Sequence, residues 1–93
     1  MSRKKKEPLL LRAAERFDLP ADVVAGLPYM ELLGDREFFM DSHQGILSYS
    51  DTAIDLNAGA LVIRLRGSGL ELKAMSEEAL RIGGTIRQIE LVR

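Results

Sequence analysis

The chain has 93 residues, of which 46% are hydrophobic, so it supports one compact core and is too short for two independent ones. The absence of cysteine excludes a disulfide framework and a thiolate metal site, and it fits a reducing compartment. The formal net charge of −1 hides an asymmetry, because Arg3, Lys4, Lys5 and Lys6 precede a mildly acidic body.

No apolar run approaches the roughly 20 residues that span a bilayer, since Arg12 directly follows the leucines at 9–11. The basic start also lacks the apolar segment and the cleavage site of a secretory signal. These features predict a cytoplasmic protein. We expect residues 1–7 to form a basic, flexible tail, with contact to an anionic membrane or to nucleic acid as the alternative.

A helical segment is predicted over residues 8–28. Pro8 suits the first turn of a helix, and one face of residues 8–17 then collects apolar side chains at helical spacing: Leu10, Ala13, Ala14 and Phe17. A helix of about ten residues is marginal alone, so it needs the β layer or a partner to cover its apolar stripe. A second helical turn is expected over residues 20–25, ending at Gly26.

From residue 29 the apolar period changes to two, which predicts strands. Residues 29–33 and 36–41 are predicted to form a hairpin across Gly34-Asp35. The apolar run at residues 38–40 interrupts the alternation, so we expect cover on both faces there, with the second face meeting the amino-terminal helix.

Residues 45–75 are predicted to form four short strands, with breaks at residues 50–52, 57–59 and 67–69. Because directly opposed residues share a face, the residue numbers of hairpin partners have a constant sum. The expected pairs are Tyr49 with Ile54, Ile54 with Ile63, Leu56 with Leu61, Ile63 with Leu72, Leu65 with Leu70, and Arg64 with Glu71. The last three pairs predict a type II′ turn at Gly67-Ser68.

The remaining residues are predicted to form a last strand or pair of strands. The apolar parity changes between Ile86 and Ile89, which predicts a bulge or bend near Arg87-Gln88, and Gly83-Gly84 indicates a close backbone approach. The predicted fold is mainly β, an antiparallel meander over residues 29–93 that is curled into a small sandwich or barrel. A short β-solenoid is the alternative.

Two sets of residues have side chains of the types that form metal sites or catalytic triads. His43 is the only histidine, so a metal site would combine it with carboxylates such as Asp41, Asp51 and Asp55. Ser50, Asp51 and His43 contain the residue types of a hydrolytic triad, but no nucleophile elbow surrounds the serine. We interpret His43 as a turn histidine and Ser50-Asp51 as a turn whose side chains bond to local backbone. A hydrolase is therefore the third-ranked hypothesis.

One outer strand face is a candidate interaction surface. Its residues are Val62, Arg64, Arg66, Lys73 and Met75. The mixture of cationic and apolar side chains fits contact with another protein, with anionic lipid or nucleic acid as the alternative partner. No aromatic residue alternates with these cations, so nucleic acid is not expected.

Several spaced segments carry a family resemblance. They are Leu19-Pro20-Ala21-Asp22-Val23, Leu27-Pro28, Gly34, His43-Gln44-Gly45-Ile46-Leu47, Tyr49-Ser50-Asp51, Ile54, Gly59-Ala60-Leu61-Val62-Ile63, Gly67, Leu70, Gly84-Thr85-Ile86 and Ile89. With these residues the chain resembles the YabP/YqfC family of sporulation proteins from endospore-forming bacteria, the YqfC branch in particular. It departs from the family at Asp41-Ser42, where Glu-Asn is frequent, and at Arg66 before Gly67, where the family has a tighter Ile-x-Gly rhythm.

The resemblance implies a non-enzymatic protein made in the mother cell during endospore formation. YqfC members are associated with a neighbouring membrane protein of the same programme, YqfD, so we expect a structural or interaction module with a partner of that type. The resemblance transfers no catalytic residue, cofactor or metal site. Expected locations are the mother-cell cytoplasm and the periphery of the forespore-facing membrane, and an open sheet edge would favour a homo-oligomer.

Overall fold

The computed structural model describes residues 27–93, and every regular element in that range is a strand. The strands are β1 (Tyr29–Leu33), β2 (Glu37–Asp41), β3 (Ile46–Tyr49), β4 (Ala53–Ala58), β5 (Leu61–Met75) and β6 (Ala79–Val92). They form one antiparallel sheet in the order β1-β2-β6-β5-β4-β3. The mainly β prediction is confirmed, and the antiparallel pairing excludes the solenoid. The predicted tail and helices within residues 1–26 lie outside the described residues.

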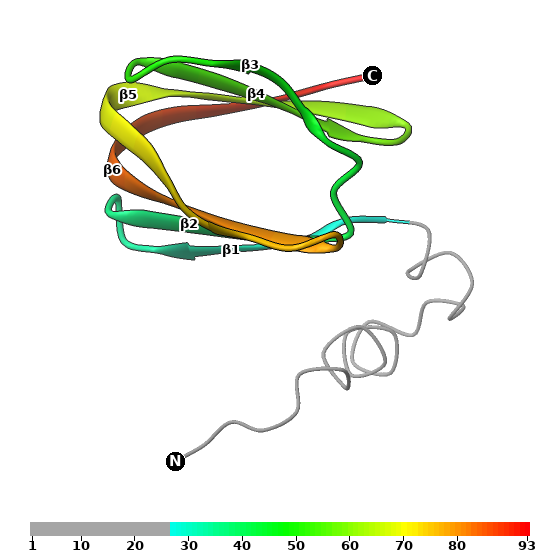
Figure 1. Cartoon of the computed structure of the whole chain (residues 1–93). Coiled ribbons are helices and arrows are strands. Elements are labelled where there is room, and N and C mark those ends of the chain that lie inside the picture. The colour runs from blue at the N-terminus through cyan, green and yellow to red at the C-terminus, as the bar shows by residue number, and fades with distance from the viewer. Residues whose placement is uncertain (1–26) are drawn as a thin grey trace.

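The sheet folds over itself because its two longest strands run through both layers (Figure 1). One layer contains β3 and β4 with the first half of β5 and the last half of β6. The second contains β1 and β2 with the first half of β6 and the last half of β5. We call these the β3–β4 layer and the β1–β2 layer. The sheet remains open and does not close into a barrel.

Glycines allow β5 and β6 to bend together between the layers. A Cβ added to Gly84, whose φ is +130°, would lie 2.5 Å from the carbonyl oxygen of Gly69. A Cβ on Gly67 would collide with the carbonyl oxygen of Thr85. Only residues without a side chain permit the two backbones to come this close. The predicted close approach at Gly83-Gly84 is therefore confirmed.

The tips of the two short hairpins hold this bend. In the β3–β4 turn, the carbonyl groups of Thr52 and Asp51 accept hydrogen bonds from the amides of Gly67 and Leu70, at 3.0 and 2.8 Å. In the β1–β2 turn, the carbonyl groups of Arg36 and Asp35 accept from Gly84 and Ile86, at 3.2 and 2.8 Å. Each hairpin therefore satisfies backbone groups that the bend removes from the β5–β6 ladder.

The predicted turn at Gly67-Ser68 is wrong, because β5 continues through it. Leu65 pairs with Ile89 and Leu72 with Ile82, both on β6, while Arg64 faces Glu90 and not Glu71. The residue numbers 65 and 70 have an odd sum, which predicts a hairpin pair, but this sum has a cause other than a turn. The register shifts between Arg66 and Gly67 and again between Ser68 and Glu71, and these bulges change which face the later residues occupy.

The other register predictions hold better. Three of them are confirmed: the hairpin across Gly34-Asp35, the pairing of Tyr49 with Ile54, and the bulge near Arg87-Gln88. The β4–β5 pairs are displaced by two residues, since Ile54 faces Leu65 and Leu56 faces Ile63. The turn occupies Gly59-Ala60, one residue later than predicted, and an even displacement keeps every side chain on its expected face.

The core lies between the two layers. Its largest fully buried side chains come from both: Phe38, Met40, Ile54, Leu56, Ile63, Leu65, Leu80 and Ile82. Met30, Ile46, Leu61, Leu72 and Ile89 pack around this cluster and remain partly exposed. Among residues 27–93, one face of each layer is therefore covered by the other layer.

Candidate interaction surface

His43 is a structural residue that joins the loop after β2 to the β5–β6 turn. It is only 8% exposed, its Nε2 lies 2.9 Å from the carbonyl oxygen of Ser76, and its Nδ1 lies 3.0 Å from the amide nitrogen of Gly45. The amide can only donate, so Nδ1 accepts and the proton is on Nε2, which donates to Ser76. Both ring nitrogens are therefore engaged in holding the fold.

Ser50 and His43, two of the residues considered for a hydrolytic triad, do not lie in one site. His43 and Ser50 lie beyond opposite ends of β3. The Ser50 hydroxyl oxygen accepts hydrogen bonds from the amides of Thr52 and Ala53, at 3.3 and 3.0 Å, as a turn residue does. Among residues 27–93 there is also no group of three or more His, Cys, Asp or Glu side chains arranged to hold a metal. The turn interpretation of both residues is thus the one that matches the geometry.

The structure divides the predicted surface residues between the two layers. Val62, Arg64 and Arg66 lie in the part of β5 that pairs with β4. Lys73 lies beyond the bend, over Gly83 of β6, and its ammonium is 3.3 Å from the Glu71 carboxylate. Met75 faces Leu80, which is buried, so Met75 belongs to the inner face, at its open end.

Two arginines of the β3–β4 layer, Arg64 and Arg66, are paired with neighbouring carboxylates. Arg66 Nη1 donates to Asp55 Oδ1 at 2.8 Å, while Arg64 lies 3.9 Å from Asp55 and 3.7 Å from Glu90. The hydrogen bond from Arg66 lowers the pKa of Asp55. Partial burial opposes this shift, whereas a hydrogen bond from Ser48 and the charges of both arginines add to it. The outer face of the β3–β4 layer therefore carries a row of ion-paired side chains.

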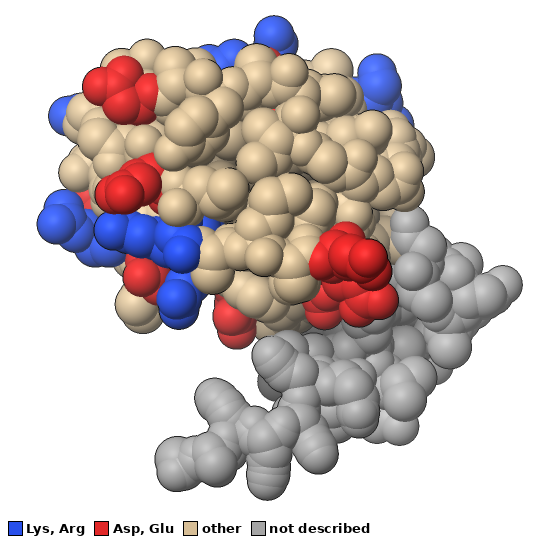
Figure 2. All heavy atoms as spheres, in the orientation of Figure 1, with Lys and Arg blue, Asp and Glu red and all other residues tan. Residues whose placement is uncertain are grey.

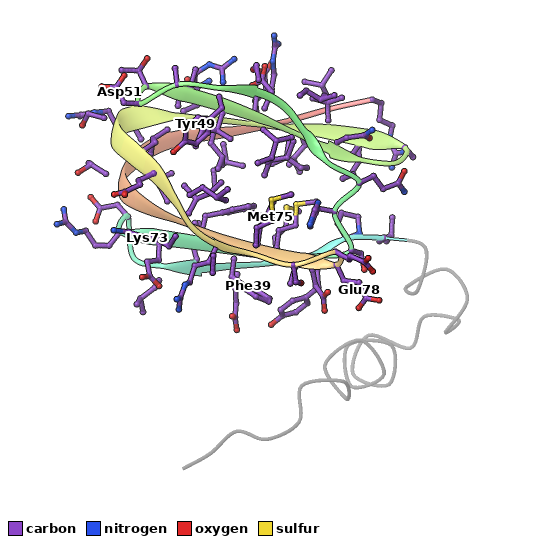
Figure 3. All side chains as sticks on the ribbon, in the orientation of Figure 1. Phe39, Tyr49, Asp51, Lys73, Met75 and Glu78 are labelled. Carbon is purple, nitrogen blue, oxygen red and sulfur yellow. The ribbon has the colours of Figure 1, made fainter. Side chains whose placement is uncertain are left out.

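The outer face of the β1–β2 layer is different. Four directly opposed residues form one row across its four strands: Glu31 on β1, Phe39 on β2, Arg81 on β6 and Ala74 on β5. Figure 3 shows Phe39 on the side of its layer that points away from the core. We call these residues the Phe39 row.

Two hollows lie on this face, one on each side of Phe39 and Arg81. The first, of about 370 Å³, is lined by Glu31, Leu32, Leu33, Glu37, Phe39 and Arg81. The second, of about 250 Å³, is lined by Phe39, Ala74, Met75, Ser76, Ala79, Leu80 and Arg81. Phe39 and Arg81 line both hollows and form the ridge between them.

Acidic side chains lie on the β1 and β2 strands of this face, and two of them, Glu31 and Glu37, line the first hollow. Glu37 and Asp41 alternate with Phe39 along β2 and so share its outer face, and Glu31 faces it from β1. The Tyr29 hydroxyl donates to the Glu31 carboxylate at 3.3 Å. Burial raises the pKa of Tyr29, and the Glu31 charge and hydrogen bond raise it further.

A third region lies where the edge of β3 meets the edge of the last half of β5. The amide of Leu72 donates to the Tyr49 hydroxyl at 3.0 Å, which brings the end of β3 beside the last half of β5. Leu47, Tyr49 and Met75 are 56, 52 and 49% exposed there. Figure 2 shows that charged side chains in this view gather at the margins around an uncharged middle. We call these three residues the β3–β5 surface.

Sequence reasoning identified part of these surfaces. Met75 was among the predicted residues, and the broken alternation at residues 38–40 predicted cover on both faces of that strand. Glu31, Arg81 and Ala74 were missed because their row depends on β6 inserting between β2 and β5. That pairing joins residues about 40 positions apart, and no local pattern encodes it.

The described residues contain no helix that is long and apolar enough to cross a membrane. The model of the YabP family matches residues 27–93, the same residues that form the sheet. The uncharacterized protein YqfC of Bacillus subtilis is 26% identical over 76 residues, which cover 82% of each chain. No solved structure matches. Because the family model covers well over half of the sequence, the chain belongs to the YabP family.

Proposed function

We propose that this protein is a non-enzymatic sporulation protein of the mother cell, and that it works as an interaction module for a membrane protein of the YqfD type. The observation that carries the proposal is the match of the YabP family model across residues 27–93. Membership of this sporulation-associated family supports the biological setting. The partner and the cell compartment follow from the YqfC resemblance.

The arrangement of the polar residues supports an interaction role. His43 and Ser50, the residues closest to catalytic types, have their polar atoms committed to backbone groups. The β3–β5 surface, in contrast, exposes large apolar side chains beside edges of β3 and β5 that pair with no other strand of residues 27–93. Exposed apolar groups of this kind are typical of protein contact sites. We therefore assign the partner contact to Leu47, Tyr49 and Met75.

Binding to anionic lipid or nucleic acid through Arg64 and Arg66 has less support. Both guanidinium groups already pair with carboxylates, and residues 27–93 carry seven Lys and Arg against ten Asp and Glu, a net charge of −3. A surface of this sign does not attract phosphates over long distances.

Affinity purification from detergent-solubilised membranes of sporulating cells tests the proposal. The wild-type chain should recover the YqfD-type membrane protein, identified by mass spectrometry, whereas Leu47→Glu and Met75→Glu should each reduce recovery at least about tenfold, the effect of losing an anchor contact of about 1.4 kcal/mol or more. Leu91→Glu is the matched control, because Leu91 is 55% exposed on β6 and lies outside the β3–β5 surface.

Circular dichroism of each variant confirms that the sheet is intact. Failure of the wild-type chain to recover any membrane protein, together with a strictly monomeric state in solution, would contradict the proposal. Equal loss with Leu91→Glu would contradict the assigned surface.

A further inference from the structure

The Phe39 row has the dimensions of a short helix. The row crosses four adjacent strands, which are about 4.8 Å apart, so its ends are about 14 Å apart. An amphipathic helix over residues 8–17, at 1.5 Å per residue, is about 15 Å long. Such a helix could lie along the row and cover all four strands.

The order of large and small side chains in residues 8–17 matches the order of hollows and ridge on the outer face of the β1–β2 layer. The apolar stripe of residues 8–17 has a large side chain at each end, Leu10 and Phe17, and the small Ala13 and Ala14 between them. The face has a hollow at each end and a ridge between them. Small residues above a ridge and large residues above hollows are what close packing requires.

The charges agree with one orientation. The segment 1–26 carries six Lys and Arg against four Asp and Glu, a net charge of +2, and four of its cations, at residues 3–6, precede the helix. The acids Glu31, Glu37 and Asp41 are on the β1–β2 end of the face. A helix whose amino end lies over that side places both the cations and its positive dipole end beside these carboxylates.

Chain connectivity allows this position. Residues 18–28 connect the helix to β1, and eleven residues span up to about 37 Å when extended, well over the width of the layer. The covalent link raises the effective concentration of the segment at the face to the millimolar range, typical of short linkers. The outer face of the β3–β4 layer offers no equivalent, since ion pairs of Asp55, Arg64 and Glu90 cross it.

We propose that residues 8–17 of this chain dock as a helix along the Phe39 row of the same molecule, with Leu10 over the first hollow, Phe17 over the second, and Ala13 and Ala14 above Phe39 and Arg81. The docked helix gives the β1–β2 layer the second cover that its apolar residues 38–40 call for. It leaves Leu47 and Tyr49 of the β3–β5 surface accessible, whereas Met75 also lines the second hollow. The inference does not depend on the proposed function.

The absence of cysteine makes disulfide crosslinking of the full chain a clean test. With Ala14→Cys and Ala74→Cys together, mild oxidation should form a disulfide within one molecule. The matched pair Ala14→Cys and Ala53→Cys places the second cysteine on the outer face of the other layer, opposite Arg66. We expect the first pair to react at least tenfold faster than the second.

Substitutions in the segment identify what drives docking. Phe17→Asp should slow the Ala14→Cys/Ala74→Cys reaction to the rate of the control pair, whereas Arg16→Asp, on the opposite helix face, should leave most of the rate. Equal rates for the two cysteine pairs would overturn the proposal, and so would a disulfide that forms between molecules, since it would assign the row to a second copy. The far-ultraviolet circular dichroism of each variant shows that the sheet is folded.

Discussion

At the scale of single residues, His43 matters because it satisfies two backbone groups that belong to different parts of the fold. Its ring bonds to Ser76 of the β5–β6 turn and to Gly45 before β3, while the amides of Ser42 and His43 both donate to the Glu78 carbonyl oxygen, at 2.6 and 3.2 Å. The crossing loop between the layers is thereby tied to the turn. Histidine is a residue type that is often catalytic, but His43 has a structural role in this chain, because it connects the loop to the turn.

We expect His43→Phe to destabilise the fold by about 2 kcal/mol, because each buried polar group left unsatisfied costs about 1–3 kcal/mol and water reaches part of this site. Urea unfolding followed by circular dichroism measures the change. Glu77→Ala, in the same turn, is the control, and it should lie within about 0.5 kcal/mol of wild type, as exposed positions do. A His43→Phe variant as stable as wild type would show that the two hydrogen bonds do not hold the loop.

Asp55 gives the fold a defined dependence on pH. Its pKa in the folded chain is lower than its ordinary value, so its ionised form stabilises the fold above the pKa of an unfolded aspartate, about 3.9. This contribution disappears as the pH falls through the lower, folded-state pKa. Asp55→Asn should therefore lose about 1 kcal/mol at pH 7, the order of a charge-assisted hydrogen bond at a partly exposed site.

Denaturant unfolding from pH 7 to pH 2 checks this prediction. The difference in unfolding free energy between wild type and Asp55→Asn should shrink as the solution becomes acidic. Asp51→Asn, in the exposed β3–β4 turn, is the control for the loss of one aspartate carboxylate. A difference that is constant down to pH 2 would mean that Arg66 does not stabilise the carboxylate.

At the scale of elements, the decisive feature is the paired bend of β5 and β6. The bend requires Gly84 at φ +130°, close to the Gly69 carbonyl oxygen, and the hairpin tips then complete the hydrogen bonding. Two long strands can therefore belong to both layers, which two straight strands could not. The two-layer architecture therefore depends on these glycines, because they permit the bend.

Gly84→Ala should destabilise the fold by about 3 kcal/mol or more, because the added Cβ meets backbone atoms that cannot rotate away and the φ is one that only glycine adopts easily. Gly69→Ala is the matched control. Its φ is +61°, but no atom lies within 4 Å of the added Cβ, so only the left-handed backbone cost of about 1–2 kcal/mol applies. Thermal and urea unfolding of both variants measure the difference, and equal losses would contradict the close approach.

The same bend explains where sequence reasoning failed. Alternation correctly predicted the hairpin of β1 and β2, the pairing of Tyr49 with Ile54 and the bulge beside Arg87, since these depend on neighbours in the chain. A glycine-rich triplet such as residues 67–69 marks either a turn or a bend, and both change the parity of the apolar residues. Only the long-range partner, Ile89 for Leu65, distinguishes them.

At the scale of the whole molecule, the bent hairpin makes the two layers one unit. The backbones of β5 and β6 and the loop between β2 and β3 connect the two layers, and the core is formed by side chains from both. Neither layer buries its apolar face alone. A chain of this kind should unfold in a single step, and the long-range pairing of β2 with β6 should slow its folding.

The chain has two tyrosines and no tryptophan, and each tyrosine reports on one layer. Tyr29 is in β1 and Tyr49 is in β3, so the Tyr49→Phe variant reports on the β1–β2 layer and the Tyr29→Phe variant on the β3–β4 layer. In each variant the urea midpoint from tyrosine fluorescence should coincide with the midpoint from circular dichroism.

Because Tyr49→Phe loses the hydrogen bond from the Leu72 amide, we expect its midpoint to be lower by the equivalent of about 1 kcal/mol. The fluorescence and circular dichroism midpoints of this variant should still agree. A fluorescence transition that precedes the circular dichroism transition in only one variant would show that its layer opens alone, and the shared bend would then not be what couples the two halves.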